Sequence, residues 1–144
     1  MSNTQASSLP ATKTGRGWHI TLWTIQILLA VLYAMSGVMN TFMPPSQLIS
    51  MGMSHAAVLP YALLRFLGIA ELAGVVGLLL PAFSRIKPGL TPLAALGFVV
   101  LQVLAMGYHI THGEFFMLPV NLVLLALAAL VWWGRTKKSP IASR

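Results

Sequence analysis

Four long apolar runs constrain the fold more than any other feature of the sequence. They extend from Trp18 to Met43, Pro60 to Leu80, Gly89 to Ile110 and Glu114 to Trp133. Each could form a helix that crosses a hydrocarbon layer of about 30 Å, which takes about 20 residues. A membrane β-barrel would instead show segments of about 10 residues that alternate polar and apolar side chains, and no such alternation occurs. We therefore predict an all-α integral membrane protein, a four-helix bundle.

The composition agrees with a membrane protein and excludes several classes. Apolar residues make up 57% of the 144 residues and charged residues only 8%, against about 25% charged in soluble domains. The chain contains two acidic residues and nine Lys and Arg residues, which gives a net charge of +7. The basic residues lie mostly at the ends of apolar runs, where they signal topology, so we expect the lipid bilayer and no nucleic acid as partner. The chain has no cysteine, which excludes disulfides and thiolate metal sites within it.

The positions of the basic residues predict the orientation. The connection 44–59 and the short turn after Ile110 contain no Lys or Arg. By the positive-inside rule both termini are cytoplasmic, in a multi-pass cell-membrane protein of bacterial inner-membrane type. Eight basic residues fall on the cytoplasmic side: Lys13, Arg16, Arg85, Lys87, Arg135, Lys137, Lys138 and Arg144.

The chain divides into three parts by composition. Residues 1–16 are rich in Ser, Thr and Ala and are predicted to be a disordered cytoplasmic leader. The four-helix domain covers 17–135, and a basic cytoplasmic tail covers 136–144. A signal peptide is the alternative for the first run, since Ala34-Met35-Ser36 fits a small-x-small cleavage site. The run is longer than a usual signal core, and cleavage would remove one helix from the bundle.

Glu71 is an acid in the middle of the second apolar run. It lies about 10 residues from the run's start, or about 15 Å, which is near the bilayer midplane. A charge there costs about 2.5 to 3.5 kcal/mol on insertion scales, so the side chain should face the bundle interior. Gly68, Gly74 and Val75 share its helix face at spacings of three and four. Arg65 is six residues away, about 120° around the helix, and is not an expected ion-pair partner.

Polar residues of the other runs lie at similar depths. Gln26, Tyr33, Gly37 and Asn40 follow one face of the first run, and Gln102 and His109 follow one face of the third. We predict a polar cavity that opens outward and is lined by Tyr33, Asn40, Arg65, Glu71, Gln102, His109 and Asn121.

Simpler roles remain open for these residues. Asn, Gln and Tyr commonly form hydrogen bonds between membrane helices without binding anything. Arg65 could extend to the outer headgroups, and a neutral Glu71 could hold two helices together.

Neither a catalytic residue nor a metal site is expected. The segment YHITHGE contains His109, His112 and Glu114, but these supply at most a partial ligand set. The eight methionines show no repeated paired spacing and are expected to pack in the core. The sequence contains no nucleophile with an adjacent base and no glycine-rich nucleotide loop, so independent catalysis is not expected.

The pattern R-x-x-G-x-x-E-x-x-G resembles the second helix of the DoxX-like membrane proteins. Supporting features are Ser36 and Gly37 in the first run, the His and Glu near the last turn, and the basic tail. The resemblance covers about Trp18 to Arg135 and implies a four-helix bundle. Many relatives carry a Lys at the position of Asn40, and its absence here removes a charged partner for the acid. The residues that carry the second-helix pattern are Arg65, Gly68, Glu71, Gly74, Leu78, Leu79, Leu80 and Pro81.

The resemblance implies a range of functions, from subunits linked to quinone-coupled oxidoreductases to membrane assembly factors. The first hypothesis is an accessory protein whose cavity binds a quinone-like or other lipophilic molecule for a membrane oxidoreductase, with Arg65 and Glu71 orienting its polar head. The second is a small proton-coupled transporter in which Glu71 carries a proton, and four spans without a repeat would then require self-association. The third is an assembly factor that needs only the bundle.

Overall fold

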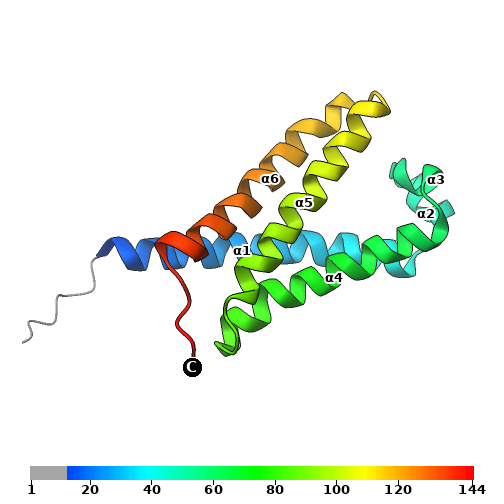
Figure 1. Ribbon diagram of the computed structural model, residues 1–144. Coiled ribbons are helices and arrows are strands. Elements are labelled where there is room, and N and C mark those ends of the chain that lie inside the picture. Colours follow the sequence, from blue (N-terminus) through cyan, green and yellow to red (C-terminus); the bar gives the residue numbers. More distant parts are fainter. Residues whose placement is uncertain (1–12) are drawn as a thin grey trace, which may run out of the picture.

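The computed structural model describes residues 13–144, and these residues form helices joined by short connections, with no strand among them (Figure 1). The elements are α1 (Lys13–Phe42), α2 (Pro45–Ser50), α3 (His55–Val58), α4 (Tyr61–Ser84), α5 (Leu90–Thr111), η1 (Phe115–Met117), α6 (Leu118–Trp133) and η2 (Gly134–Lys138).

In the described part of the chain, four helical segments are long and apolar enough to cross a membrane, which confirms the predicted all-α class with four spans. They are Gly15–Phe42, Tyr61–Ser84, Leu90–Thr111 and Phe115–Lys138. Large apolar side chains cover their outer surfaces; Phe66 and Phe83, for example, are 64% and 81% exposed. Such surfaces suit contact with lipid.

The helix bounds differ from the apolar runs at three places. Residues 13–16 of the predicted leader belong to α1, while 1–12 lie outside the described residues. Helix α4 continues to Ser84, past Pro81, since a proline removes only one backbone hydrogen bond and membrane helices tolerate this loss. The last span extends into a π-helical turn, η2, which contains the start of the predicted basic tail.

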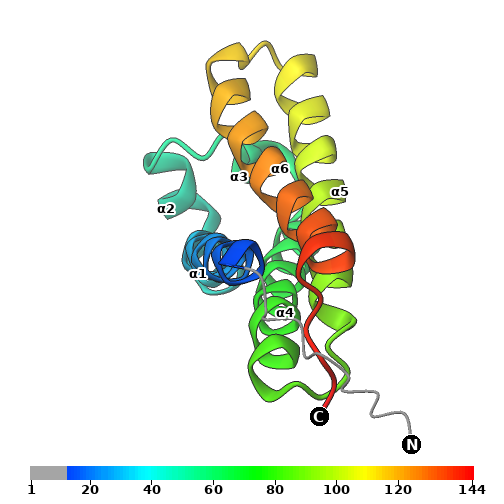
Figure 2. The same cartoon turned by 90° about the vertical axis from the view of Figure 1, so that its left-hand side faces the viewer.

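Helices α1 and α4 lie side by side, and the α5–α6 hairpin crosses them obliquely (Figures 1 and 2). Toward α2 and α3 the hairpin diverges from the α1–α4 pair (Figure 1). All four long helices contribute to one apolar core, whose buried members are Leu29, Ala30, Tyr33, Leu78, Ala95, Phe98, Ala128 and Val131.

A close approach of two backbones positions α4 against α1. A Cβ atom at Gly68 would lie 2.7 Å from the backbone nitrogen of Thr41 and 2.8 Å from the carbonyl oxygen of Gly37. Only glycine fits between these two backbones, as in other membrane helix pairs with small residues at the interface. The contact places Glu71, one turn further along α4, next to α1.

A smaller core holds the short helices α2 and α3 on one end of the α1–α4 pair. Leu48, Ala56 and Leu64 are buried there, and three methionines pack around them. The methionines fill irregular space between short elements, as flexible thioether side chains commonly do. This packing brings His55, the first residue of α3, over the polar residues of α1.

Candidate functional site

Glu71 is the centre of a hydrogen-bonded cluster between α4 and α1. The residue is buried, with 8% of its surface exposed. The hydroxyl of Ser36 lies 3.0 Å from Oε1 and 3.1 Å from Oε2, and the amide nitrogen of Asn40 donates to Oε2 at 3.2 Å. Asn40 Nδ2 also lies 3.3 Å from Ser36 Oγ. The spacing of four between Ser36 and Asn40 puts both on one face of α1, facing the acid.

Two basic side chains extend this cluster toward α3. His55 Nε2 lies 3.2 Å from Asn40 Oδ1, and since a carbonyl oxygen only accepts, the ring nitrogen donates. Arg65 Nη1 donates to the backbone carbonyl oxygen of Asn40 at 2.7 Å, and its guanidinium lies 4.5 Å from the centre of the Tyr61 ring. Arg65 therefore caps the end of α1 and does not contact the carboxyl group of Glu71.

The cluster gives Glu71 only neutral partners. Within residues 13–144, the single ion pair joins His109 to Glu114, so Glu71 has no cation. The amide nitrogen of Asn40 donates in every case, whereas the hydroxyl of Ser36 can donate to a carboxylate or accept from a carboxylic acid. The same geometry therefore accommodates both protonation states of the carboxyl group.

Tyr33 and Gln102 form a second polar pair one turn away along α1. Gln102 Nε2 lies 2.6 Å from the hydroxyl oxygen of Tyr33, and the exposures of the two residues are 5% and 4%. The Tyr33 ring stacks on the Phe98 ring, with centroids 3.9 Å apart. Gly74 has no side chain and so leaves room for the edge of the Phe98 ring. Gln102 Oε1 is buried and accepts no hydrogen bond from any residue of 13–144, so this amide has one unused acceptor.

His109 and Glu114 pair at the turn between α5 and η1, at 2.6 Å. Ser54 and His109 both hydrogen-bond the carboxyl group of Glu114 and hold its pKa below the usual range. Burial lowers the pKa of His55, and the nearby His109 ring acts in the same direction, while Glu114 opposes them. His112 instead stacks on Tyr108, 4.1 Å between centroids, and no three His or acidic side chains in 13–144 could together hold a metal ion.

The structure thus distributes the seven predicted residues over separate groups. Glu71 contacts the side chain of Asn40, whereas Arg65 contacts the backbone of Asn40 and the ring of Tyr61. Tyr33 pairs with Gln102, and His109 pairs with Glu114. Asn121 is buried on α6, and its Nδ2 has no hydrogen-bond partner in the part of the chain that the structure describes.

Ser36 and His55 belong to the Glu71 cluster although the site prediction omitted them. The spacing of four residues between Ser36 and Asn40 puts both on one helix face, so the sequence could have predicted that Ser36 belongs to the site. His55 lies in the connection between two long helices. Helical periodicity does not apply there, so it could not predict which residues His55 contacts.

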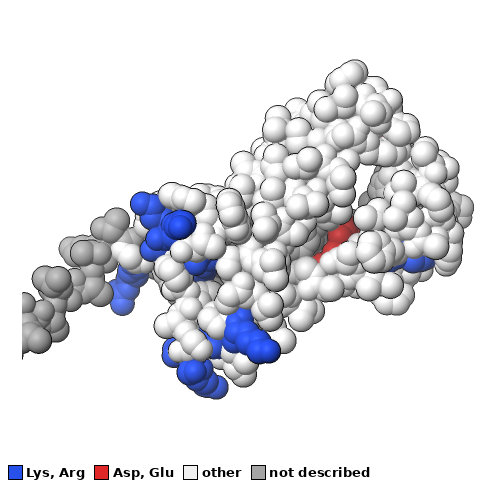
Figure 3. Space-filling view, viewed as in Figure 1, with Lys and Arg blue, Asp and Glu red and all other residues white. Residues whose placement is uncertain are grey.

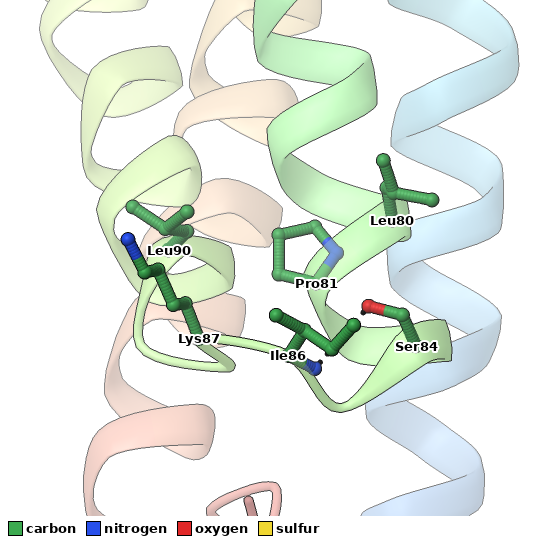
Figure 4. Close-up of a pocket in the computed structure, with 6 residues that line it drawn as sticks. All are labelled: Leu80, Pro81, Ser84, Ile86, Lys87 and Leu90. Atoms are coloured by element: carbon green, nitrogen blue, oxygen red, sulfur yellow. Dashed lines mark hydrogen bonds between the residues drawn. The ribbon is translucent and has the colours of Figure 1, made fainter. Parts of the chain in front are cut away.

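The molecular surface is hollowed between the α5–α6 hairpin and the α2–α3 end, and acidic atoms are visible beside the hollow (Figure 3). Helix α4, which carries Glu71, runs along this part of the molecule (Figure 1). A different cavity, of about 300 Å³, lies at the α4–α5 turn, and Ser84 and Lys87 are the only polar side chains among the residues that line it (Figure 4). None of the seven predicted residues lines that second cavity. Its lining consists of Leu80, Pro81, Ser84, Ile86, Lys87 and Leu90.

A comparison with protein families identifies the chain. The model of the DoxX-like family matches residues 24–131, about three quarters of the sequence, including the whole of α4 and α5. No curated protein and no solved structure matches significantly. With four membrane-capable helices and this match, the chain belongs to the DoxX-like family of multi-pass membrane proteins.

Proposed function

We propose that this protein binds a lipophilic molecule with a hydroxylated polar head, of the quinol type, at Glu71, and serves a membrane oxidoreductase as an accessory subunit. The proposed orientation has both termini in the cytoplasm. The Glu71 cluster then faces the hollow on the outer side of the membrane.

The observation that carries the proposal is a buried carboxyl group with neutral partners and unused acceptor capacity. Glu71 Oε1 receives only the shared hydroxyl of Ser36, whereas a carboxylate offers about four lone-pair sites. Gln102, which hydrogen-bonds Tyr33 of α1, supplies in Oε1 a second buried acceptor without a partner among residues 13–144. A ligand that donates two hydrogen bonds would satisfy both groups, and a quinol carries two hydroxyl groups on an apolar ring.

The accessory role is the second part of this proposal. In it, electron transfer belongs to a partner subunit, and this protein supplies the site that holds or delivers the lipophilic molecule.

A second candidate function, proton-coupled transport, is favoured by one feature. Glu71, Asn40 and His55 form a continuous hydrogen-bonded row from the middle of α4 to the start of α3. The geometry at Glu71 accommodates both protonation states, as a proton carrier requires. Asn40 cannot itself release a proton under ordinary conditions, so in this alternative water would have to complete the path.

Mass spectrometry of the small molecules that co-purify with the protein tests the proposal. Wild type should carry a quinone or quinol above the background of the membrane extract, and Glu71→Gln should carry much less. Glu114→Gln is the matched control, because it neutralises the other acid of the chain at the outer turn, and it should retain the wild-type amount.

Three outcomes would overturn the proposal. Equal retention by all three proteins would remove Glu71 from the binding site. Absence of quinones from the wild type, with a stoichiometric protein partner present, would favour the assembly factor. Absence of quinones, with pH-driven solute uptake into vesicles that Glu71→Gln abolishes, would favour transport.

A further inference from the structure

A second buried charge lies at the opposite end of the molecule, where Lys and Arg gather on the surface (Figure 3). Arg135, in the turn η2, is only 3% exposed. The two acids of the chain, Glu71 and Glu114, are engaged elsewhere, and within residues 13–144 no carboxylate lies within ion-pair distance of Arg135. A buried cation is costly unless an anion compensates it, so this site lacks its counter-charge.

Neutral acceptors hold the Arg135 guanidinium in place. Nε donates to Gln26 Oε1 at 2.6 Å, and Nη1 donates to the carbonyl oxygen of Ser139 at 3.2 Å. Gln26 in turn donates to the carbonyl oxygen of Leu78, so α1, α4 and η2 share one network. Nη2 is buried and has no hydrogen-bond partner among residues 13–144. The guanidinium therefore keeps donor capacity that the chain does not use.

His19 adds a further donor. Its Nδ1 lies 3.2 Å from Arg135 Nη1. Because arginine only donates, Nδ1 must accept, and the ring proton then resides on Nε2.

A cavity of about 380 Å³ lies on the other side of His19 and Trp23 from this cation, and Arg135 itself is not among the residues that line it. His19 and Trp23 line the cavity and also contact Arg135, the Trp23 ring at 5.7 Å from the guanidinium carbon. Arg85 supplies a second positive charge to the lining. The C-terminal segment forms one wall, and the backbone nitrogen of Arg144 donates to the carbonyl oxygen of Arg85 at 3.0 Å.

The remaining lining of the cavity is apolar. It consists of Ala82, Phe83, Pro140, Ile141 and Ala142. Cationic and apolar walls therefore meet in one cavity, at the end of the molecule where Trp18 and Trp133 pack edge to face, 5.6 Å between centroids. Paired tryptophans and basic residues at a helix end are typical of the boundary between hydrocarbon and headgroups.

We propose that this cavity is a binding site for one anionic phospholipid, with the phosphate near Arg135, Arg85 and His19 and the glycerol and upper acyl chain against the apolar wall. A guanidinium matches the geometry of phosphate oxygens, and the phosphate supplies the missing negative charge. Anionic lipids are enriched in cytoplasmic leaflets, which agrees with the proposed orientation of this end. The site is separate from Glu71, which lies about 10 Å along α4 from Leu78.

Native mass spectrometry in detergent tests this site with phosphatidylglycerol and phosphatidylcholine of identical acyl chains. Wild type should retain one phosphatidylglycerol in clear preference to phosphatidylcholine. Arg85→Gln, at the exposed rim, should weaken that retention about fivefold, as expected for about 1 kcal/mol from one basic contact. Arg135→Gln should weaken the retention of phosphatidylglycerol further. If the Arg135→Gln variant does not fold, the result for Arg85→Gln alone tests the site.

Lys137→Gln is the matched control, because it removes one positive charge from an exposed residue of the same turn that does not line the cavity. It should change retention less than twofold. Equal loss in Arg85→Gln and Lys137→Gln would show diffuse surface attraction and overturn the site. No lipid preference in the wild type would also overturn it. Thermal stabilisation by inorganic phosphate equal to that by phosphatidylglycerol would overturn the lipid assignment in favour of a soluble anion.

Discussion

The structure buries two charged side chains against α1, Glu71 from α4 and Arg135 from η2. Both are held by neutral side chains: Ser36 and Asn40 donate to the carboxyl group, whereas Gln26 accepts from the guanidinium. Neither has an opposite charge among the described residues. The difference lies in the remaining capacity, since Glu71 can accept further hydrogen bonds and Arg135 can donate them. A buried carboxyl group and a buried guanidinium, each without an oppositely charged partner among the described residues, therefore suit two different ligands, a hydrogen-bond donor at one end and an anion at the other.

The largest expected difference between the two regions comes from the glycines that bring each charge against α1. Gly68→Ala would place a Cβ against backbone atoms of Thr41 and Gly37, which cannot move aside. Gly134→Ala would place it 2.6 Å from a methyl group of Leu22, which can change rotamer. We expect losses of unfolding free energy of about 3 kcal/mol and about 1 kcal/mol respectively. Melting temperatures in one detergent measure both, and equal losses would contradict the backbone contact at Gly68.

Smaller losses of stability are expected for two substitutions of Glu71, which together distinguish the contribution of its charge from that of its hydrogen bonds. Glu71→Leu leaves the amide of Asn40 and the hydroxyl of Ser36 with fewer partners and should lower stability by about 2 kcal/mol. Glu71→Gln keeps an acceptor oxygen and should cost less than about 1 kcal/mol. The measurement is chemical denaturation of both variants in the same micelles. A Gln variant as unstable as the Leu variant would mean that the negative charge itself holds α1 and α4 together.

The smallest effect is the pH dependence that His55 contributes at the Glu71 end. The pKa of His55 is lowered from its ordinary value of 6.5, so the unfolded chain binds a proton before the folded one does. Stability is then complete above pH 6.5 and decreases as the pH falls through 6.5 toward the lower folded pKa. The lowered pKa of Glu114 acts in the same sense, but only below its ordinary value of 4.5.

Melting curves between pH 7.5 and 5 measure this dependence. His55→Gln should flatten the curve between pH 6.5 and 5, because it removes the group that takes up the proton. An unchanged slope in that variant would assign the pH response to other groups.

The sequence predicted the fold and the position of Glu71 for the same physical reason. Hydrocarbon requires long apolar helices, and a single acid inside one of them must face the interior. The hydrogen-bond partners of Glu71 and Arg65 were harder to predict, since they depend on the geometry of side chains between helices. The amide of Asn40 donates to the acid, and Arg65 donates to a backbone carbonyl oxygen.

Arg135 was interpreted only as a topology signal because it stands among other basic residues at the end of a span. Its burial follows from Gly134 and the π-helical turn, which bring the end of the last span against Leu22 of α1. Neither feature has a recognisable pattern in the sequence. The same holds for His55, whose place depends on the small core that holds α2 and α3.

Equilibrium binding of a short-chain benzoquinol, kept reduced under anaerobic conditions, tests the central claim most directly. A hydrogen bond to a carboxylate is stronger than one to an amide oxygen by about 1.4 kcal/mol, so Glu71→Gln should raise the Kd about tenfold. Glu114→Gln should leave the Kd of the wild type unchanged. A Kd for Glu71→Gln within twofold of the wild-type value would contradict the assignment of Glu71 as the ligand-binding group.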